Sequence, residues 1–153
     1  MSFRSTLPMM CAVALAAAMS GCITVPQPAP RASPERDAAA KTFQAPTEGK
    51  ANLYVFRDEW RGGDIAAIVY LDGNLLGMTT HKTYLHAQVG PGIHKIVSKL
   101  DDSSEVEVKA EAGRTYFVWQ EIKGSFSHGT VLHVVDEQRG RPGVSSCELV
   151  GQP

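Results

Sequence analysis

The sequence predicts an all-β fold, an antiparallel β-sandwich of about seven to nine short strands. Apolar and polar residues alternate in short runs over 49–150, which is the period of a half-buried strand. Turn residues such as Asp72-Gly73 and Pro91-Gly92 separate these runs. The same stretch shows no amphipathic helix longer than two turns. With 153 residues, 43% of them apolar, the chain is expected to form one domain.

The first residues resemble the signal of a bacterial lipoprotein. Arg4 precedes an uncharged stretch over 7–19, which is shorter than the ~20 apolar residues of a membrane-spanning helix. Ser20-Gly21-Cys22 then resembles a lipobox, in which small residues precede the cysteine that receives the lipid. We therefore expect a signal peptide over 1–21 and lipidation of Cys22; the alternative is an ordinary secretory signal with a chance cysteine. By analogy with enterobacterial sorting, Ile23 after the cysteine favours the outer membrane, facing the periplasm.

Residues 22–48 are expected to form a flexible tether rich in Pro and Ala between the lipid and the β domain. A short helix is predicted inside it over 34–43, because Ser33 is a good N-cap and Pro34 suits the first helical position. A helix of this length is marginal alone. If it forms, we expect Phe43 to dock it on the domain.

The β domain is predicted to span 49–150, with neighbouring strands antiparallel because the links are short. The expected strands are 51–57, 64–72, 74–78, 84–89, 93–100, 105–109, 114–122, 129–135 and 146–150. Segment 64–72 is apolar on both faces and is predicted to be a central strand with both faces covered. Segment 105–109 alternates cleanly, which indicates one buried and one solvated face.

Segment 114–122 carries several aromatic residues. Strand alternation places Phe117 and Trp119 on one face and Tyr116 with Val118 on the other. Core packing is the expected role of these side chains. The alternative is an exposed aromatic stripe on which a glycan stacks.

The order of these motifs resembles one known family. The stretches concerned are KANLYVFRDEWRGG, VYLDGNLLGMTTHKTYLHAQVGPGIHKI, AGRTYFVWQEIK and LHVVDEQRG. Together they are similar to the bacterial domain of unknown function 2846, over about 33–150. Within them, VYLDGNLLG, VGPGIHKI and AGRTY also resemble the PEGA-type β-sandwich repeat. The resemblance implies a short envelope lipoprotein with a β-sandwich, and it implies no catalytic residues.

Signatures of catalysis are absent from the sequence. It has no GxSxG, HExxH, P-loop or dinucleotide-binding motif. Ser125 and Ser127 beside His128 are explained better by a small polar loop than by a nucleophile. With 15 Lys+Arg against 16 Asp+Glu, a strongly basic nucleic-acid binder is excluded. We therefore expect no enzymatic activity, no cofactor and no nucleic-acid partner.

Histidine and cysteine side chains leave one alternative open. After processing and lipidation Cys147 is the remaining thiol, so no intramolecular disulfide is expected, and a buried apolar role suits it. The alternative function is a small periplasmic metal-binding protein or enzyme that uses Cys147 and the histidines, although no metal ligands are assigned. The five histidines are His81, His86, His94, His128 and His133.

The segment between the first two predicted strands is the candidate binding loop. Loops on a rigid sandwich often carry binding, and Trp and Arg are favoured at interface hot spots. The alternative is that Trp60 folds back to cover the sheet edge. The candidate residues are Arg57, Asp58, Trp60, Arg61 and Asp64. The expected function is a non-enzymatic, lipid-anchored module that binds an envelope protein or glycan, or that scaffolds an assembly.

Overall fold

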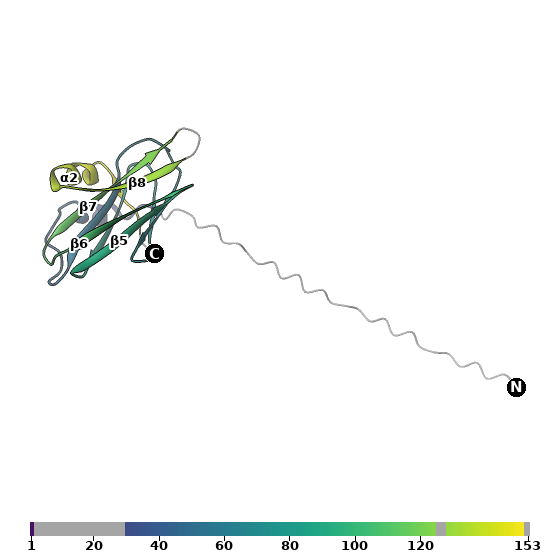
Figure 1. Ribbon diagram of the computed structural model, residues 1–153, viewed down its shortest axis with the longest axis horizontal. Coiled ribbons are helices and arrows are strands. Elements are labelled where there is room, and N and C mark those ends of the chain that lie inside the picture. Colours follow the sequence, from purple (N-terminus) through teal and green to yellow (C-terminus); the bar gives the residue numbers. More distant parts are fainter. Residues whose placement is uncertain (2–29, 125–127, 152–153) are drawn as a thin grey trace.

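The computed structural model describes Met1, residues 30–124 and residues 128–151 (Figure 1). The expected signal peptide apart from Met1, together with Cys22, Ser125 and Ser127, lies outside the described residues. In chain order the elements are α1 (Pro34–Ala40), β1 (Ala51–Arg57), β2 (Ala67–Leu71), β3 (Asn74–Thr79), β4 (Thr83–Val89), β5 (Gly92–Lys99), β6 (Ser103–Ala110), β7 (Thr115–Lys123), β8 (Gly129–Val135), α2 (Glu137–Ser145) and β9 (Glu148–Leu149). In this part of the chain no helix is long and apolar enough to cross a membrane.

The predicted β-sandwich is confirmed. One sheet has the strand order β8-β7-β1-β4-β9 and the other has the order β3-β2-β5-β6. Every predicted strand has a counterpart, and β1 and β8 have the predicted bounds. The sandwich is not purely antiparallel, because β7 runs parallel to β1 and β9 runs parallel to β4.

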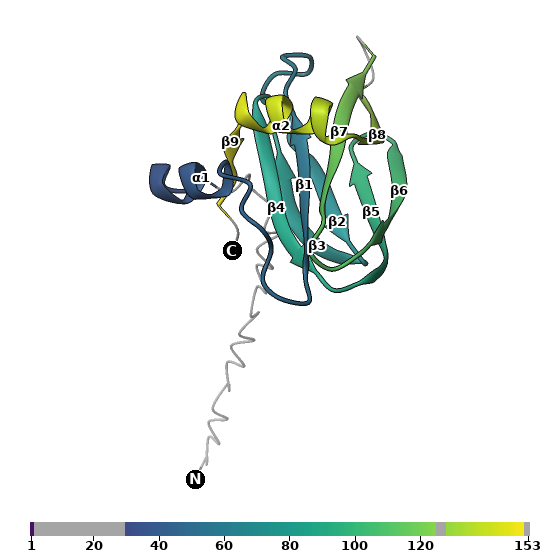
Figure 2. The same ribbon diagram turned by 90° about the vertical axis from the view of Figure 1, so that its left-hand side faces the viewer.

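A third layer of helices covers the five-stranded sheet (Figure 2). The inner face of this sheet packs on the four-stranded sheet, where Val55 lies opposite both Leu85 and Val118. Its outer face packs under α2 and the segment that carries α1, through Tyr54, Phe117 and their neighbours. All seven residues of β1 are buried as a result.

Segment 64–72 is central as predicted, because β2 lies between β3 and β5, but its two faces are not both covered as those of β1 are. Burial alternates along β2, and Ile65 before it is exposed. The outer face of the four-stranded sheet is partly apolar but carries no helix among the described residues. Apolar residues on two faces of a short segment thus do not distinguish a strand that is covered on both faces from one with a solvated face.

The helix α2 was not predicted from the sequence. Gly140, Pro142 and Gly143 all lie within it and disfavour a helix in isolation. Asp136 caps its N-terminus, since the carboxylate accepts a hydrogen bond from the backbone N–H of Arg139. Both glycines are buried against the sheet, so close packing offsets the weak intrinsic preference of this segment.

The second half of the predicted tether packs on the β domain. The helix at Pro34–Ala40 confirms the short helix, with Ser33 at its N-cap and Phe43 against the rings of Tyr54 and Phe117. Before the helix, Arg31 forms a β-bridge with Val150. The described residues that pack on the sandwich therefore include those from 31 onward, which precede the domain boundary that the sequence placed at residue 49.

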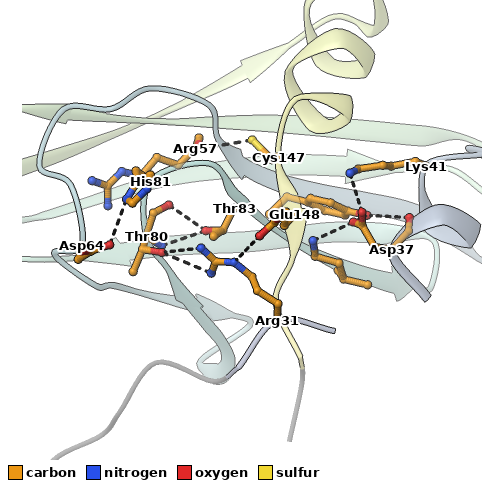
Figure 3. A network of polar contacts seen from close by, with 12 residues as sticks. Arg31, Asp37, Lys41, Arg57, Asp64, Thr80, His81, Thr83, Cys147 and Glu148 are labelled. Carbon is orange, nitrogen blue, oxygen red and sulfur yellow. Dashed lines mark hydrogen bonds and ion pairs between the residues drawn. The ribbon is translucent and has the colours of Figure 1, made fainter. Parts of the chain in front are cut away.

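Asp37 fastens α1 to the sheet (Figure 3). Its Oδ1 accepts hydrogen bonds from the Tyr84 hydroxyl and the Leu149 N–H, both at 2.9 Å, and its Oδ2 lies 2.6 Å from Lys41 Nζ. Burial raises the pKa of Asp37, but the hydrogen bonds from Lys41, Leu149 and Tyr84 outweigh it, so the pKa is lowered overall. The ionised form is thus the one that the folded state stabilises.

Replacing Asp37 with Asn is expected to lower the free energy of unfolding at pH 7 by about 1–2 kcal/mol, because two charge-assisted hydrogen bonds and an ion pair are weakened. A lowered folded-state pKa gives stability above the unfolded-state pKa and loses it as the pH falls through the folded value. The difference between wild type and Asp37→Asn should therefore shrink below about pH 4. Urea denaturation at pH 7 and pH 3 measures it, with the exposed Glu48→Gln as control. A difference that stays constant down to pH 3 would contradict this role.

Candidate functional site

Arg57 ends β1 and organises the following loop from inside. Its side chain is fully buried. Nη1 donates to the Ile65 carbonyl at 2.8 Å, and Nη2 donates to the Arg61 carbonyl at 2.6 Å and the Gly63 carbonyl at 3.2 Å. Burial lowers the pKa of Arg57, although a guanidinium stays charged in proteins. Arg57, predicted as a binding residue, is therefore unavailable to a partner and instead shapes the loop.

Two acidic residues tie the same loop to the rest of the domain. Asp58 forms an ion pair with Arg139 of α2, with contacts of 2.8 and 3.0 Å. Glu59 Oε1 accepts a hydrogen bond from the Ile122 N–H at 2.6 Å. Asp58 was also predicted as a binding residue, but its carboxylate is engaged in holding the loop against α2.

The remaining predicted site residues face solvent. Trp60 is 69% exposed and stacks one face on the ring of His81, with centroids 4.3 Å apart. Arg61 is exposed, and Asp64 Oδ1 lies 3.2 Å from His81 Nδ1. A tryptophan this exposed does not serve to cover a sheet edge. The loop thus exposes an aromatic side chain, and its backbone is fixed by the hydrogen bonds from Arg57.

The aromatic residues of β7 belong to the core. Phe117 is buried under α2, and Tyr116 packs toward the space between the sheets. Trp119 is partly buried between the ring of His133 and the guanidinium of Arg139, at 5.0 and 5.1 Å. The predicted alternation of faces is confirmed, and the exposed stripe for glycan stacking is not present on this strand.

The described histidines do not form a metal-binding cluster. Within the described residues no three side chains of His, Cys, Asp or Glu gather as a metal site would require. Two of the histidines pair with a carboxylate each: His94 Nδ1 lies 2.7 Å from Asp72 Oδ2, and His133 Nε2 lies 2.9 Å from Glu121 Oε2. Sequence reasoning could not decide this, since it does not reveal which loops meet.

A groove of about 500 Å³ lies between α1, the segment 44–47 and the outer face of β1 and β4. Its floor carries Asn52, His86 and Gln88, which come from two adjacent strands. Asn52 Oδ1 accepts from His86 Nε2 and Gln88 Nε2, each at 3.1 Å. Burial lowers the pKa of His86, so its ring is neutral near pH 7.

Asn52 also holds the groove open. Its Nδ2 donates to the Gln44 carbonyl at 2.9 Å, which fixes the segment opposite the strands. Small side chains form the walls of the groove, with Ala39 on the side of α1 and Ala45 on the side of the segment 44–47. Arg36 also lines the groove. Sequence reasoning missed this groove because its lining comes from residues between 36 and 149, and no local motif marks it.

Comparison with known proteins places these features in a family. The model of a family described as protein of unknown function (DUF2846) matches residues 47–133. A protein from Haemophilus influenzae, described as an uncharacterized protein, is 31% identical over 139 residues, which cover 90% of this chain and 80% of that protein. This chain belongs to the DUF2846 family. The resemblance that the sequence indicated is therefore confirmed, and no solved structure matches the chain.

The DUF2846 match includes the candidate loop but only part of the groove. The loop that carries Trp60 and the groove floor at Asn52 and His86 lie within the matched residues. The helices α1 and α2 lie outside them, together with Arg36 on the groove lining. The match thus covers most of the sandwich but neither helix, nor β9.

Cys147 of this DUF2846 protein is part of the outer core. It is buried next to Tyr54, Tyr84 and Leu149, and its S–H donates to the Arg57 carbonyl at 3.5 Å (Figure 3). Burial raises the pKa of the thiol to about 11. Reactive cysteines have the opposite character, with a lowered pKa and an accessible sulfur.

We expect Cys147 to resist alkylation in the folded protein at pH 8, because both accessibility and thiolate content are low. Peptide mapping by mass spectrometry after iodoacetamide treatment measures this, and the peptide that contains Cys147 should be unlabelled. The same peptide should be fully labelled when the protein is treated in concentrated urea. Rapid labelling under native conditions would point to a reactive thiol.

Proposed function

We propose that this DUF2846 protein is a lipid-anchored, non-enzymatic protein of the bacterial envelope whose β-sandwich binds an envelope component, a protein or a glycan. The anchor is the lipid on Cys22, and the binding surface is the loop over 58–65. The domain faces the periplasm from the outer membrane.

The observation that carries the binding role is the exposed Trp60 on an ordered loop. Three carbonyls of the loop segment are bonded to Arg57, and Glu59 is bonded to β7, so the backbone around Trp60 is held in place. A rigid loop loses little conformational entropy on binding. Tryptophan is among the residue types most enriched at interface hot spots.

The anchoring role is supported by the sequence. Residues 7–19 have the length of a signal peptide, and Ser20 and Gly21 precede Cys22 as in a lipobox. We expect metabolic labelling with palmitate to mark the wild-type protein and not Cys22→Ser, and we expect the wild type to fractionate with outer membranes. Equal labelling of both proteins would overturn the assignment of the anchor.

Site-specific photo-crosslinking in the native envelope tests the binding surface. A photoreactive amino acid is placed at Trp60 or at Arg61, and at the exposed Glu111 in the turn between β6 and β7 as a control. We expect an adduct from position 60 or 61 and none from position 111. The adduct from position 61 should also weaken when Trp60 is replaced by Ala. The absence of a specific adduct from folded, membrane-bound variants would refute the loop as the binding surface.

A further inference from the structure

We propose that the groove under α1 is a saccharide-binding site. It is lined by none of the residues of loop 58–65, so this proposal does not depend on Trp60. Its volume of about 500 Å³ suits one or two sugar rings, and ligand sites of proteins commonly enclose ~300–1,000 Å³.

The walls and the floor of the groove have different chemistry. The amide side chains of Asn52 and Gln88 and the neutral ring of His86 form the floor, while Ala39 and Ala45 contribute to the opposite walls. A pyranose ring has the same asymmetry, with C–H groups on its faces and hydroxyl groups around its rim. The small wall residues leave room for the ring, and the floor meets its hydroxyl groups.

The floor is organised before a ligand arrives. Asn52 is 2% exposed and fixes His86, Gln88 and the Gln44 carbonyl through its own side chain. Each side-chain amide has two N–H groups, and these contacts engage one of them on Asn52 and one on Gln88. Gln88 is exposed, so its second N–H can donate to a hydroxyl or acetamido oxygen, whereas the buried Asn52 holds the floor in place. Groups held in place by such a network lose little entropy when they bind.

Charge and topology disfavour other ligands. Among the described residues that line the groove there is no carboxylate, so it offers no acidic ligand to a metal ion. Arg36 is the one cation among them, which is too little positive charge for a polyanion. A lipid chain would desolvate the amide floor without giving it hydrogen bonds. An extended peptide could not add a strand, because β1 and β4 each already have two neighbours. Arg36 suits a sugar that carries a single carboxylate.

Titration calorimetry of the full-length lipidated protein in detergent micelles tests this site. The probes are chitobiose and the disaccharide of N-acetylglucosamine and N-acetylmuramic acid. The variant Ala39→Trp places a large ring in the groove, and Ala38→Trp places the same ring on the same helix outside the lining. We expect Ala39→Trp to weaken the binding of both sugars by about tenfold or more, and Ala38→Trp to change it less than about twofold.

Two further variants keep the test decisive if Ala39→Trp perturbs the helix. Gln88→Ala should weaken both sugars, because a floor donor is lost. Arg36→Ala should weaken the muramic acid disaccharide by about tenfold and leave chitobiose unchanged, because only the muramic acid disaccharide carries a carboxylate. The absence of binding to wild-type protein at millimolar sugar, or equal binding by wild type, Ala39→Trp and Gln88→Ala, would overturn the proposal. Tighter binding of trialanine than of either sugar would also overturn it in favour of a peptide site. Neither result would bear on the crosslinks from Trp60.

Discussion

Replacement of Arg57 by Met is expected to lower the free energy of unfolding by about 3–5 kcal/mol. Methionine keeps much of the apolar stem but removes the donor of the Arg61 and Ile65 carbonyls, whereas the Gly63 carbonyl keeps the hydrogen bond from the His81 N–H. Unsatisfied polar groups in a buried position carry the full cost of desolvation. Urea denaturation monitored by circular dichroism measures the loss, and hydrogen exchange should show faster exchange over 58–65.

The neighbouring Arg61 supplies the control for this prediction. Its side chain is exposed, whereas its carbonyl is one of the acceptors of Arg57. Arg61→Ala should therefore change stability by less than about 0.5 kcal/mol. Arg57→Lys should fall between the two, because an ammonium group retains the charge without the fork of the guanidinium. A loss below about 1 kcal/mol in Arg57→Met would show that the loop does not depend on these hydrogen bonds.

Replacement of Gly140 by Ala is expected to destabilise the protein by about 2–3 kcal/mol, although Ala is favoured over Gly in a helix by ~1 kcal/mol. A Cβ at this position would lie 2.1 Å from Phe117 Cγ and 2.5 Å from Phe117 Cβ. Phe117 is buried beneath α2 and its Cβ is fixed to the backbone of β7, so a change of side-chain rotamer cannot relieve the contact and the helix must shift. Thermal and urea denaturation measure the effect.

A double-mutant cycle identifies the cause of this destabilisation. If the ring of Phe117 is the obstacle, Gly140→Ala should cost less in a Phe117→Ala background than in the wild type. Gln138→Ala on the exposed side of α2 is the matched control and should be close to neutral. Equal costs in both backgrounds would place the strain at Phe117 Cβ, which alanine retains, or elsewhere in the helix.

The strands could be predicted because their signals are local. Alternation of side chains and turns such as Asp72-Gly73 depend on residues near each other in the chain, and all nine strands were found from them. The parallel pairing of β7 with β1 could not be found in this way. That pairing depends on which edges remain free once the hairpins have formed, and this is a property of the whole sheet.

The helical layer shows where local reasoning fails. The segment of α2 contains Gly140 and Gly143, which argue against a helix until the rings of Phe56 and Phe117 are placed beneath them. In proteins most helical stability comes from tertiary packing. The same layer explains why β1 is buried on both faces although its sequence ANLYVFR includes Asn52 and Arg57.

The candidate loop was located from sequence, but the division of roles within it was not. Composition marks Arg57, Asp58, Trp60, Arg61 and Asp64 equally as polar or aromatic loop residues. The structure separates Arg57 and Asp58, which hold the loop, from Trp60, which is exposed. Burial of a long charged side chain depends on the carbonyls that the folded loop offers it, and no sequence pattern reports these.

The bridge between Arg31 and Val150 also limits how far the sandwich can lie from Cys22. Eight residues lie between Cys22 and Arg31, and a fully extended chain of that length spans about 30 Å. If all of 22–48 were free, the span would be about 90 Å. A lipid on Cys22 would thus hold the sandwich within roughly one protein diameter of the bilayer. The molecules that it can meet are then those at the membrane surface, or those that themselves extend toward it.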